Sequence, residues 1–365
     1  MSLVRKILGF YRTIQYSVCG RHTHGILQPG QECHIEPFKS EINHGDVVHP
    51  CVRYIKDGYE GHCWWMVYTP YYGADPGMEN PILCYAESND TTPPIDWKVY
   101  CEVNPKPEKG YNSDPTLLFT DNKLYVFWRE YNTPACDESG RAVGTFGGIV
   151  EKGKIINRFG PVVWSDDLEI DPEVSPTFIE KDGGYECLAM HLKFHSKWIK
   201  KQHPVIKSLL TKILAITDLL GLGGQQKSYG IARWTSDRID KPFVYKETVN
   251  FRKCNKLYRP WHMDFFEYQG RYYSIVQTNQ SNADLCLAWS EDGRTYTFYE
   301  KPLITNVTIA KLGIYKPCAG VVDGVFYLYY TAQNPNNRTQ NRLFLTIHDW
   351  NSLSLCFFKS DSFFV

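Results

Sequence analysis

The stretch YNSDPTLLFTDNKLYVFWRE, residues 111–130, reads as two short β-strands joined by a tight turn. Apolar and aromatic residues that favour strands fill both halves. Between them, Asn122 can supply the positive φ that a two-residue hairpin needs. Pro115 has no N–H for a sheet ladder, so it belongs at the first position of a strand. Asp114 therefore stands immediately before a strand that is otherwise apolar.

The same pattern occurs four more times along the chain. Each copy has a polar residue, usually followed by proline, then a short apolar strand, a turn of Asp, Gln or Gly, and an aromatic-rich strand. The copies are VVHPCVRY from Val47, EVSPTFIEKDGGYECLAMH from Glu173, RPWHMDFFEYQGRYYSIVQT from Arg259 and IYKPCAGVVDGVFYLYYTAQ from Ile314. In the first copy the segment IKDGYEGHCWWMVYT predicts a longer turn.

The spacing of these copies predicts the fold. Their polar residues are His49, Asp114, Ser175, His262 and Lys316, separated by 65, 61, 87 and 54 residues. The long interval contains HPVIKSLLTKILAITDLLGLGG, residues 203–224, which has a helical pattern, and without these 22 residues it would be 65. Five multi-stranded antiparallel sheets of similar length predict an all-β fold, a five-bladed β-propeller.

We therefore divide the chain into an amphipathic N-terminal helix, residues 1–20, and a single propeller, residues 21–365, with blades starting near 49, 114, 175, 262 and 316 and the helical insertion 203–224. The strand around ECHIEPF, residues 32–38, is expected to pair with the last blade and close the ring. Residues 1–18 and 203–222 are basic and amphipathic, so each is a candidate for peripheral membrane contact. The alternative is that both helices pack on the domain itself.

The amino-acid composition indicates which binding partners and which cellular compartment to expect. The 365 residues hold 40 Lys+Arg and 40 Asp+Glu, and we see no long basic run, so nucleic acid is not an expected partner. The 12 cysteines form no CxxC pair and no zinc-like spacing, and several, such as Cys51 and Cys318, lie in apolar strand-like runs. Buried thiols and a start without a convincing signal peptide predict a cytoplasmic protein, at most peripheral at the inner face of the cell membrane.

In a propeller the first strand of every blade lines the central axis. The five polar residues that open the copies should therefore form one ring around a shared pocket. We expect the residue before each proline to be extended. His262 and Asp264 are two apart in a strand, so they should point to the same face.

The motifs carry a family resemblance. They are HP at 49–50, ENP at 79–81, SDP at 113–115, WRE at 128–130, SPT at 175–177 and PWHMD at 260–264. Over about residues 45–335 the chain resembles the superfamily of five-bladed propeller enzymes that includes glycoside hydrolase families 43, 32 and 130, and in it a bacterial glycosyl-hydrolase-like branch. The resemblance to family 43 implies three carboxylates from the first three blades, acting as base, orienting group and acid.

The chain departs from that family pattern. Asp114 matches the second carboxylate, but His49 stands at the first position and Ser175 at the third, with Glu173 two residues away. A histidine can serve as a general base near neutral pH, so hydrolysis remains open. The candidate catalytic residues are His49, Asp114, Glu130, Glu173 and Asp264.

A second group of residues is expected to bind the substrate. It comprises Glu79, Arg129, Ser175, Trp261, His262 and Lys316. Arg129 and Lys316 can hold a carboxylate or phosphate, and Trp261 can stack on a sugar ring. No phosphate-binding loop, nucleophile elbow or HExxH motif is present, and we expect no cofactor and no metal. Convergence of His49, Asp114 and His262 on a metal is the alternative to that expectation.

The resemblance implies a glycoside hydrolase-like, carbohydrate-active enzyme. It would act on a glycosidic bond in the central channel through carboxylate and histidine acid–base chemistry, with a saccharide or polysaccharide as its partner. The cysteine usage and the basic helices favour one alternative, a membrane-associated glycosyltransferase of surface polysaccharide synthesis. The missing aspartate of the first blade favours another, a non-catalytic glycan-binding propeller.

Overall fold

The computed structural model describes residues 25–38, 46–108, 110–131, 143–164, 171–192, 203, 205–206, 229–252, 260–278, 284–299, 301–305, 313–334 and 337–358. The predicted N-terminal helix, residues 1–20, lies outside these residues. Most of the predicted insertion 203–224 also lies outside them. Both helices therefore stay predictions, as does the membrane contact proposed for them.

Strands make up most of the described chain, in consecutive antiparallel series. The first series is β3 (Val47–Tyr59), β4 (His62–Pro70), β5 (Ile82–Tyr85) and β6 (Asp96–Glu102), with the short helical turns η1 (Tyr72–Ala74) and η2 (Pro76–Met78) before β5. The next are β7 (Tyr111–Thr120), β8 (Lys123–Tyr131), β9 (Val143–Glu151) and β10 (Lys154–Val163), then β11 (Asp171–Lys181), β12 (Gly184–Leu192), β13 (Tyr229–Ser236) and β14 (Val244–Arg252). The last are β15 (His262–Tyr268), β16 (Arg271–Gln277), β17 (Leu285–Ser290) and β18 (Thr295–Phe298), followed by β19 (Ile314–Val322), β20 (Val325–Asn334), β21 (Asn337–Asp349) and the helix α6 (Trp350–Phe358).

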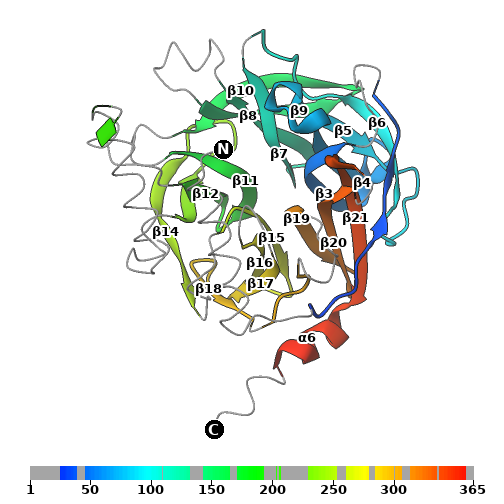
Figure 1. Cartoon of the computed structure of the whole chain (residues 1–365). Helices are drawn as coiled ribbons and strands as arrows, with labels where there is room; N and C mark the ends of the chain where they lie inside the picture. The colour runs from blue at the N-terminus through cyan, green and yellow to red at the C-terminus, as the bar shows by residue number, and fades with distance from the viewer. Residues whose placement is uncertain are drawn as a thin grey trace.

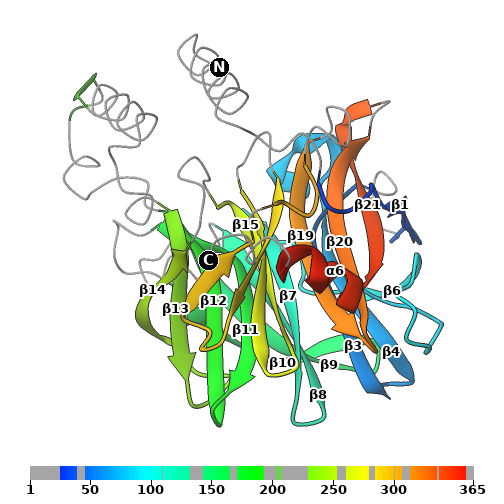
Figure 2. The same cartoon turned by 90° about the horizontal axis from the view of Figure 1, so that it is seen from below.

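These series stand around a common axis (Figure 1). The innermost strands are β3, β7, β11, β15 and β19, and each contacts the next around a closed ring, with β19 meeting β3. The third and fourth series join into one eight-stranded sheet, because β14 pairs in parallel with β18 at Asn250–Arg252. The predicted all-β propeller is confirmed, and Figure 2 shows its sheets standing side by side.

The hairpin turns follow the sequence pattern. Positive φ occurs at both central residues of the pairs 121–122, 182–183, 269–270 and 323–324, as the quoted turn motifs predict. The first series differs from the prediction of a longer turn. There Glu60 and Gly61 form the same two-residue connection, with φ of 48° and 88°. The extra residues lie instead in an irregularity of β3 between Tyr54 and Tyr59.

The N-terminal segment links the last sheet to the first. β1 (Gln31–Glu32) pairs antiparallel with β21, which confirms the predicted ring closure. β2 (His34–Ile35) continues to the other side and pairs in parallel with β6. Between them, the backbone amide of Cys33 donates to the carbonyl of Leu343 at 2.8 Å. One short segment therefore joins both sheets through backbone hydrogen bonds.

The core fills the spaces between neighbouring sheets. The cysteines predicted to be buried are buried and free of disulfides, namely Cys51, Cys63, Cys84, Cys187, Cys286 and Cys318. At the edge of the ring, Trp350 and Leu353 of α6 are buried against the strand series β15–β18 and β19–β21. Within the described residues, no helix combines the length and the apolar character that crossing a bilayer would require.

Candidate active site

Three of the five inner strands, β3, β7 and β11, share an irregularity near their starts. His49, Asp114 and Ser175 have φ of 53°, 46° and 55°, and each precedes a proline. At each of them the register to the neighbouring strand also shifts. The expectation of an extended residue before proline is thus wrong at these places. Left-handed φ at a non-glycine residue costs about 1–3 kcal/mol and is concentrated at functional sites.

Polar side chains from the five inner strands form two layers around the axis. The first layer contains the residues that open the sequence copies, namely His49, Asp114, Ser175, His262 and Lys316, all buried. The second layer lies two residues further along each strand and contains Cys51, Thr116, Thr177, Asp264 and Cys318, also buried. Within it, Cys51 Sγ lies 3.5 Å from Thr116 Oγ1, and Thr177 Oγ1 lies 3.4 Å from Asp264 Oδ1.

Asp114 is the centre of the first layer. Its Oδ1 lies 3.6 Å from His49 Nε2 and 3.7 Å from His262 Nδ1. Ser175 Oγ is 3.4 Å from the same oxygen and also hydrogen-bonds His262 Nδ1. The other oxygen, Oδ2, accepts a hydrogen bond from the guanidinium of Arg129. Residues from four blades, 213 positions apart at most, thus meet at one carboxylate.

Burial determines the charge of these groups. It lowers the pKa of His49 to about 4 and that of His262 well below its ordinary value, so both rings are neutral at pH 7. Burial would raise the pKa of Asp114, but His49 and Arg129 outweigh it and hold that pKa below its ordinary value. The layer therefore combines an ionised carboxylate with two neutral imidazoles.

Several buried polar atoms of this layer make no hydrogen bond to any of the described residues. They are both ring nitrogens of His49 and Nε2 of His262. Leaving a buried polar group unsatisfied costs about 1–3 kcal/mol. Such groups are uncommon in native proteins and call for an explanation in terms of function, water or an ion.

Glu79 adds a second carboxyl group beside this layer. The loop that carries it is tied to β7, because the amide of Asn112 donates to the Glu79 carbonyl at 3.3 Å and its side chain donates to Asn80 Oδ1 at 2.7 Å. Glu79 Oε2 lies 4.0 Å from His49 Nδ1. Burial, reinforced by the negative charge of Asp114, raises the pKa of Glu79 well above its ordinary value. The site therefore holds two carboxyl groups on either side of His49 whose pKa values are shifted in opposite directions, upward for Glu79 and downward for Asp114.

The remaining first-layer groups surround the two histidines. The amide of Lys316 donates to Gln277 Oε1 at 2.9 Å, and its side chain is buried. Tyr315 was not among the predicted site residues, yet its ring lies 5.5 Å from that of His49 and 4.5 Å from that of His262. The indole of Trp261 lies 5.9 Å from the ring of His262. Tyr315 precedes Lys316 in its motif, but an aromatic residue at a strand start suggests packing equally well.

Two predicted catalytic residues lie apart from this arrangement, and the side chain of a third is not described. Asp264 belongs to the second layer, where Arg53 binds it with both terminal nitrogens at 2.8 and 3.0 Å. Glu130 accepts a hydrogen bond from Trp128 Nε1 at 3.0 Å and pairs with Arg158. Glu173 lies in β11, but its side chain is outside the described residues. The carboxylates of Asp264 and Glu130 are thus engaged with other partners, and their catalytic roles stay predictions.

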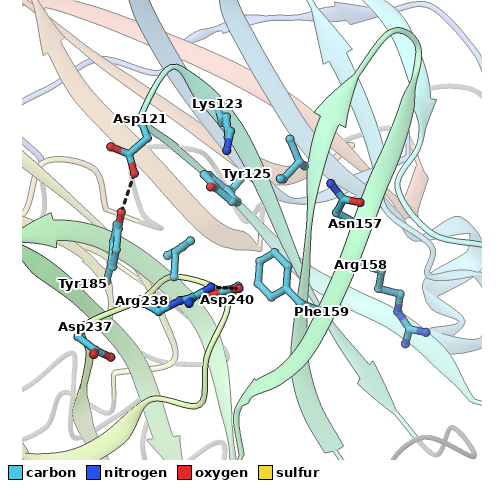
Figure 3. Close-up of a pocket in the computed structure, with 12 residues that line it drawn as sticks. Asp121, Lys123, Tyr125, Asn157, Arg158, Phe159, Tyr185, Asp237, Arg238 and Asp240 are labelled. Atoms are coloured by element: carbon cyan, nitrogen blue, oxygen red, sulfur yellow. Dashed lines mark hydrogen bonds and ion pairs between the residues drawn. The ribbon is translucent and has the colours of Figure 1, made fainter.

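A groove of about 710 Å³ lies away from the two layers (Figure 3). It opens between β8 and β10 on one side and β12 with the turn after β13 on the other. Its lining includes Tyr125, Phe159 and Tyr185, with Asp121 accepting a hydrogen bond from the Tyr185 hydroxyl at 3.2 Å. Asp121 directly follows β7, whereas Asp114 lies near its start, so this groove is at the end of β7 opposite to the first polar layer.

The solved structures that resemble this chain include enzymes that act on carbohydrates. An N-acetylgalactosamine deacetylase from F. plautii, in complex with blood group B trisaccharide, superposes with a TM-score of 0.58 at 16% identity, covering 90% of this chain and 96% of its own. A thermostable family-43 glycoside hydrolase gives 0.54 at 11% identity, covering 87% and 94%. An exo-1,5-α-L-arabinanase from a bovine ruminal metagenomic library gives 0.51 at 13% identity, covering 85% and 95%.

Neither a protein-family model nor a curated protein sequence matches the chain. The similarity to solved structures extends over most of its length, but identities this low establish the fold alone. The chain has the β-propeller fold of the family 43 glycoside hydrolases, so the predicted resemblance is confirmed at that level. Function has to be argued from the site itself.

Proposed function

We propose that the chain is a carbohydrate-active hydrolase of the glycoside hydrolase type. The inner strands form a ring of five blades, and the reaction centre is the first polar layer together with Glu79. The single observation that carries the proposal is the pair of buried carboxyl groups of Asp114 and Glu79, held on either side of His49 with pKa values shifted in opposite directions. Glycosidic bond cleavage requires one carboxyl that gives a proton and one group that stabilises or activates the attacking water.

The contacts suggest a role for each residue. Glu79 carries the proton that the leaving group needs. Asp114 is oriented by Arg129, and its negative charge faces the two neutral rings of His49 and His262. Strongly paired with Arg129, Asp114 is a weak base, so we assign the activation of water to His49. Trp261 and Tyr315 offer aromatic faces to a sugar.

A second candidate reaction is the hydrolysis of an N-acyl group on an amino sugar. The observation that favours it is the replacement of two of the three family 43 carboxylates by His49 and Ser175. The similarity to an N-acetylgalactosamine deacetylase, of which the chain covers 96%, agrees with this alternative. We find no observation that favours the glycosyltransferase over either hydrolase.

Both reactions can be tested with one set of purified proteins. Release of p-nitrophenol from aryl furanosides and pyranosides reports cleavage of a glycosidic bond. Release of acetate from N-acetylated mono- and oligosaccharides reports deacylation. We expect Glu79→Gln to lower kcat by about 10²–10⁴-fold, because proton transfer by a positioned side chain contributes that much. Asp114→Asn should lower it at least as far.

The matched control is Glu186→Gln. Glu186 is a buried carboxylate paired with an arginine, Arg233, as Asp114 is with Arg129, but it lies on β12, outside both polar layers. Its substitution should leave turnover within about threefold of the wild-type value once folding is verified by circular dichroism. Turnover that persists in both Glu79→Gln and Asp114→Asn would reject this reaction centre. Saccharide binding without any product would favour the non-catalytic alternative.

A further inference from the structure

We propose that His49, Asp114 and His262 bind a single divalent transition-metal ion, of the zinc class, at the centre of the first polar layer. For its role in catalysis this inference rests on the proposed function, whereas binding itself can be tested without any substrate. It departs from the expectation of no metal drawn from the sequence. The sequence lacked a metal-like spacing because the three ligands come from β3, β7 and β15.

The donor atoms already stand at ligand-like separations. One donor atom from each residue lies within 4.8 Å of the other two. His49 Nε2 and His262 Nδ1 are 3.6 and 3.7 Å from Asp114 Oδ1. Ligands about 2.0–2.1 Å from a tetrahedral zinc ion are about 3.4 Å apart, so the two histidine–Asp114 separations need to contract by a few tenths of an ångström, and the two histidines, whose donor atoms lie within 4.8 Å, can approach further. The ion would replace the hydrogen bond between Ser175 Oγ and His262 Nδ1.

The three side chains lie in a buried setting with unpaired donor atoms. All three are more than nine-tenths buried, and among the described residues neither ring nitrogen of His49 has a hydrogen-bond partner. An ion at this place would satisfy His49 Nε2.

Neighbouring groups hold the ligands in the orientation that metal sites use. Arg129 binds the oxygen of Asp114 that faces away from the histidines, which leaves Oδ1 for the ion. Glu79 lies behind the ring of His49, 4.0 Å from Nδ1, in the carboxylate–histidine–metal order common around zinc. Three protein ligands with an open fourth position are typical of catalytic zinc sites, where the ion polarises a carbonyl or lowers the pKa of a bound water. With the ion bound, it would take over from His49 the activation of water.

Two nitrogens and one oxygen define the class of ion. Imidazole suits Zn²⁺, Co²⁺, Ni²⁺ and Fe²⁺, whereas Ca²⁺ and Mg²⁺ prefer sites made of oxygen ligands. We therefore expect the site to prefer Zn²⁺ or Co²⁺ over Ca²⁺ by at least about 100-fold. This preference separates the proposed site from a weak electrostatic attraction of cations to Asp114.

The test uses the full chain after dialysis against a chelator. Isothermal titration with ZnCl₂ should give one site per chain, and Co²⁺ should develop the visible absorption of a four-coordinate ion with nitrogen and oxygen ligands. The exposed thiol of Cys356 is replaced in every protein by Cys356→Ser, to remove one adventitious ligand. Unfolding temperatures recorded with and without Zn²⁺ give a second readout.

Three variants test which side chains bind the ion. His49→Gln and His262→Gln should each weaken Zn²⁺ binding by about 100-fold or more and abolish the Co²⁺ spectrum. Glu79→Gln should weaken binding by about 10-fold, as removal of an outer partner does. The matched control is His34→Gln on β2, an exposed histidine whose loss should leave binding unchanged. Should a histidine variant fail to fold, titration of the wild-type protein still decides whether a site exists.

The outcomes separate this inference from the proposed function. Stoichiometric binding that both histidine variants lose supports the metal site, whatever substrate is turned over. An absence of binding to the wild-type protein, or unchanged binding in His49→Gln, overturns it. If the chelated enzyme still hydrolyses a saccharide at the wild-type rate, the catalytic role of the ion is overturned and the acid–base hydrolase stands, while the titrations decide the binding site.

Discussion

The ion pair between Arg53 and Asp264 gives a test of how the centre of the propeller is held together. Arg53 comes from β3 and Asp264 from β15, and both terminal guanidinium nitrogens reach the carboxylate, at 2.8 and 3.0 Å. Asp264 also lies 3.3 Å from the amide of Ala319 on β19. The pair therefore joins three of the inner strands, including the first and the last.

The two partners are buried to different extents. The side chain of Asp264 is 3% exposed and that of Arg53 is 19% exposed. Arg53→Met leaves a buried carboxylate without its counter-ion, which costs about 3–5 kcal/mol. Asp264→Asn leaves a partly solvated guanidinium and should cost less, about 1–3 kcal/mol. The double variant should be more stable than the sum of the two losses predicts, because it contains no unpaired charge.

Equilibrium urea unfolding, followed by tryptophan fluorescence, measures these differences as shifts of the midpoint at constant slope. We expect a coupling free energy of about 1.5–3 kcal/mol from the double-mutant cycle, the range for hydrogen bonds to charged groups. Additive losses, or a larger loss for Asp264→Asn than for Arg53→Met, would refute this account of the centre.

Three further predictions concern other parts of the fold. Gly148→Ala would place a methyl group 2.4 Å from Ile155 Cγ2 on the neighbouring strand and should cost about 1–3 kcal/mol in urea unfolding, against no loss if the Ile155 side chain can move aside. Tyr329→Phe removes a hydrogen bond of 2.7 Å from the hydroxyl to the Pro94 carbonyl, between the last and first sheets, and should cost about 1 kcal/mol; an unchanged midpoint would contradict this. Partial burial raises the pKa of Asp292, but backbone amides of the following turn outweigh it and lower that pKa to about 2. Because the folded pKa lies below the ordinary value of 3.8, this stabilisation is present above about pH 4 and is lost towards pH 2. As the carboxylate is mostly exposed, Asp292→Asn should lose less than about 1 kcal/mol at pH 7 and only a small part of that at pH 2; equal losses at both pH values would contradict the assignment.

The fold could be predicted because its signal is local and repeated. Each hairpin carries its own turn residues, as at 121–122 and 182–183, and the spacing of the copies relates them to one axis. The meeting of His49, Asp114 and His262 followed from that architecture, since the first strands of a propeller surround one centre. The convergence was therefore predictable although the residues are far apart in the sequence.

What could not be predicted depends on contacts between distant strands. Nothing near Asp264 indicates that Arg53, 211 positions away, occupies its carboxylate. The positive φ of His49 also runs against the local preference of a residue before proline, because the strand irregularity overrides that preference. Glu79 was predicted from a motif, but its place beside His49 depends on the tie between its loop and Asn112.

The most direct measurement of the central claim is a crystal structure with a bound oligosaccharide. Our account predicts sugar density at the first polar layer, with a ligand oxygen within hydrogen-bonding distance of Glu79 or His49. Density confined to the groove lined by Tyr125, Phe159 and Tyr185, at the other end of β7, would contradict it.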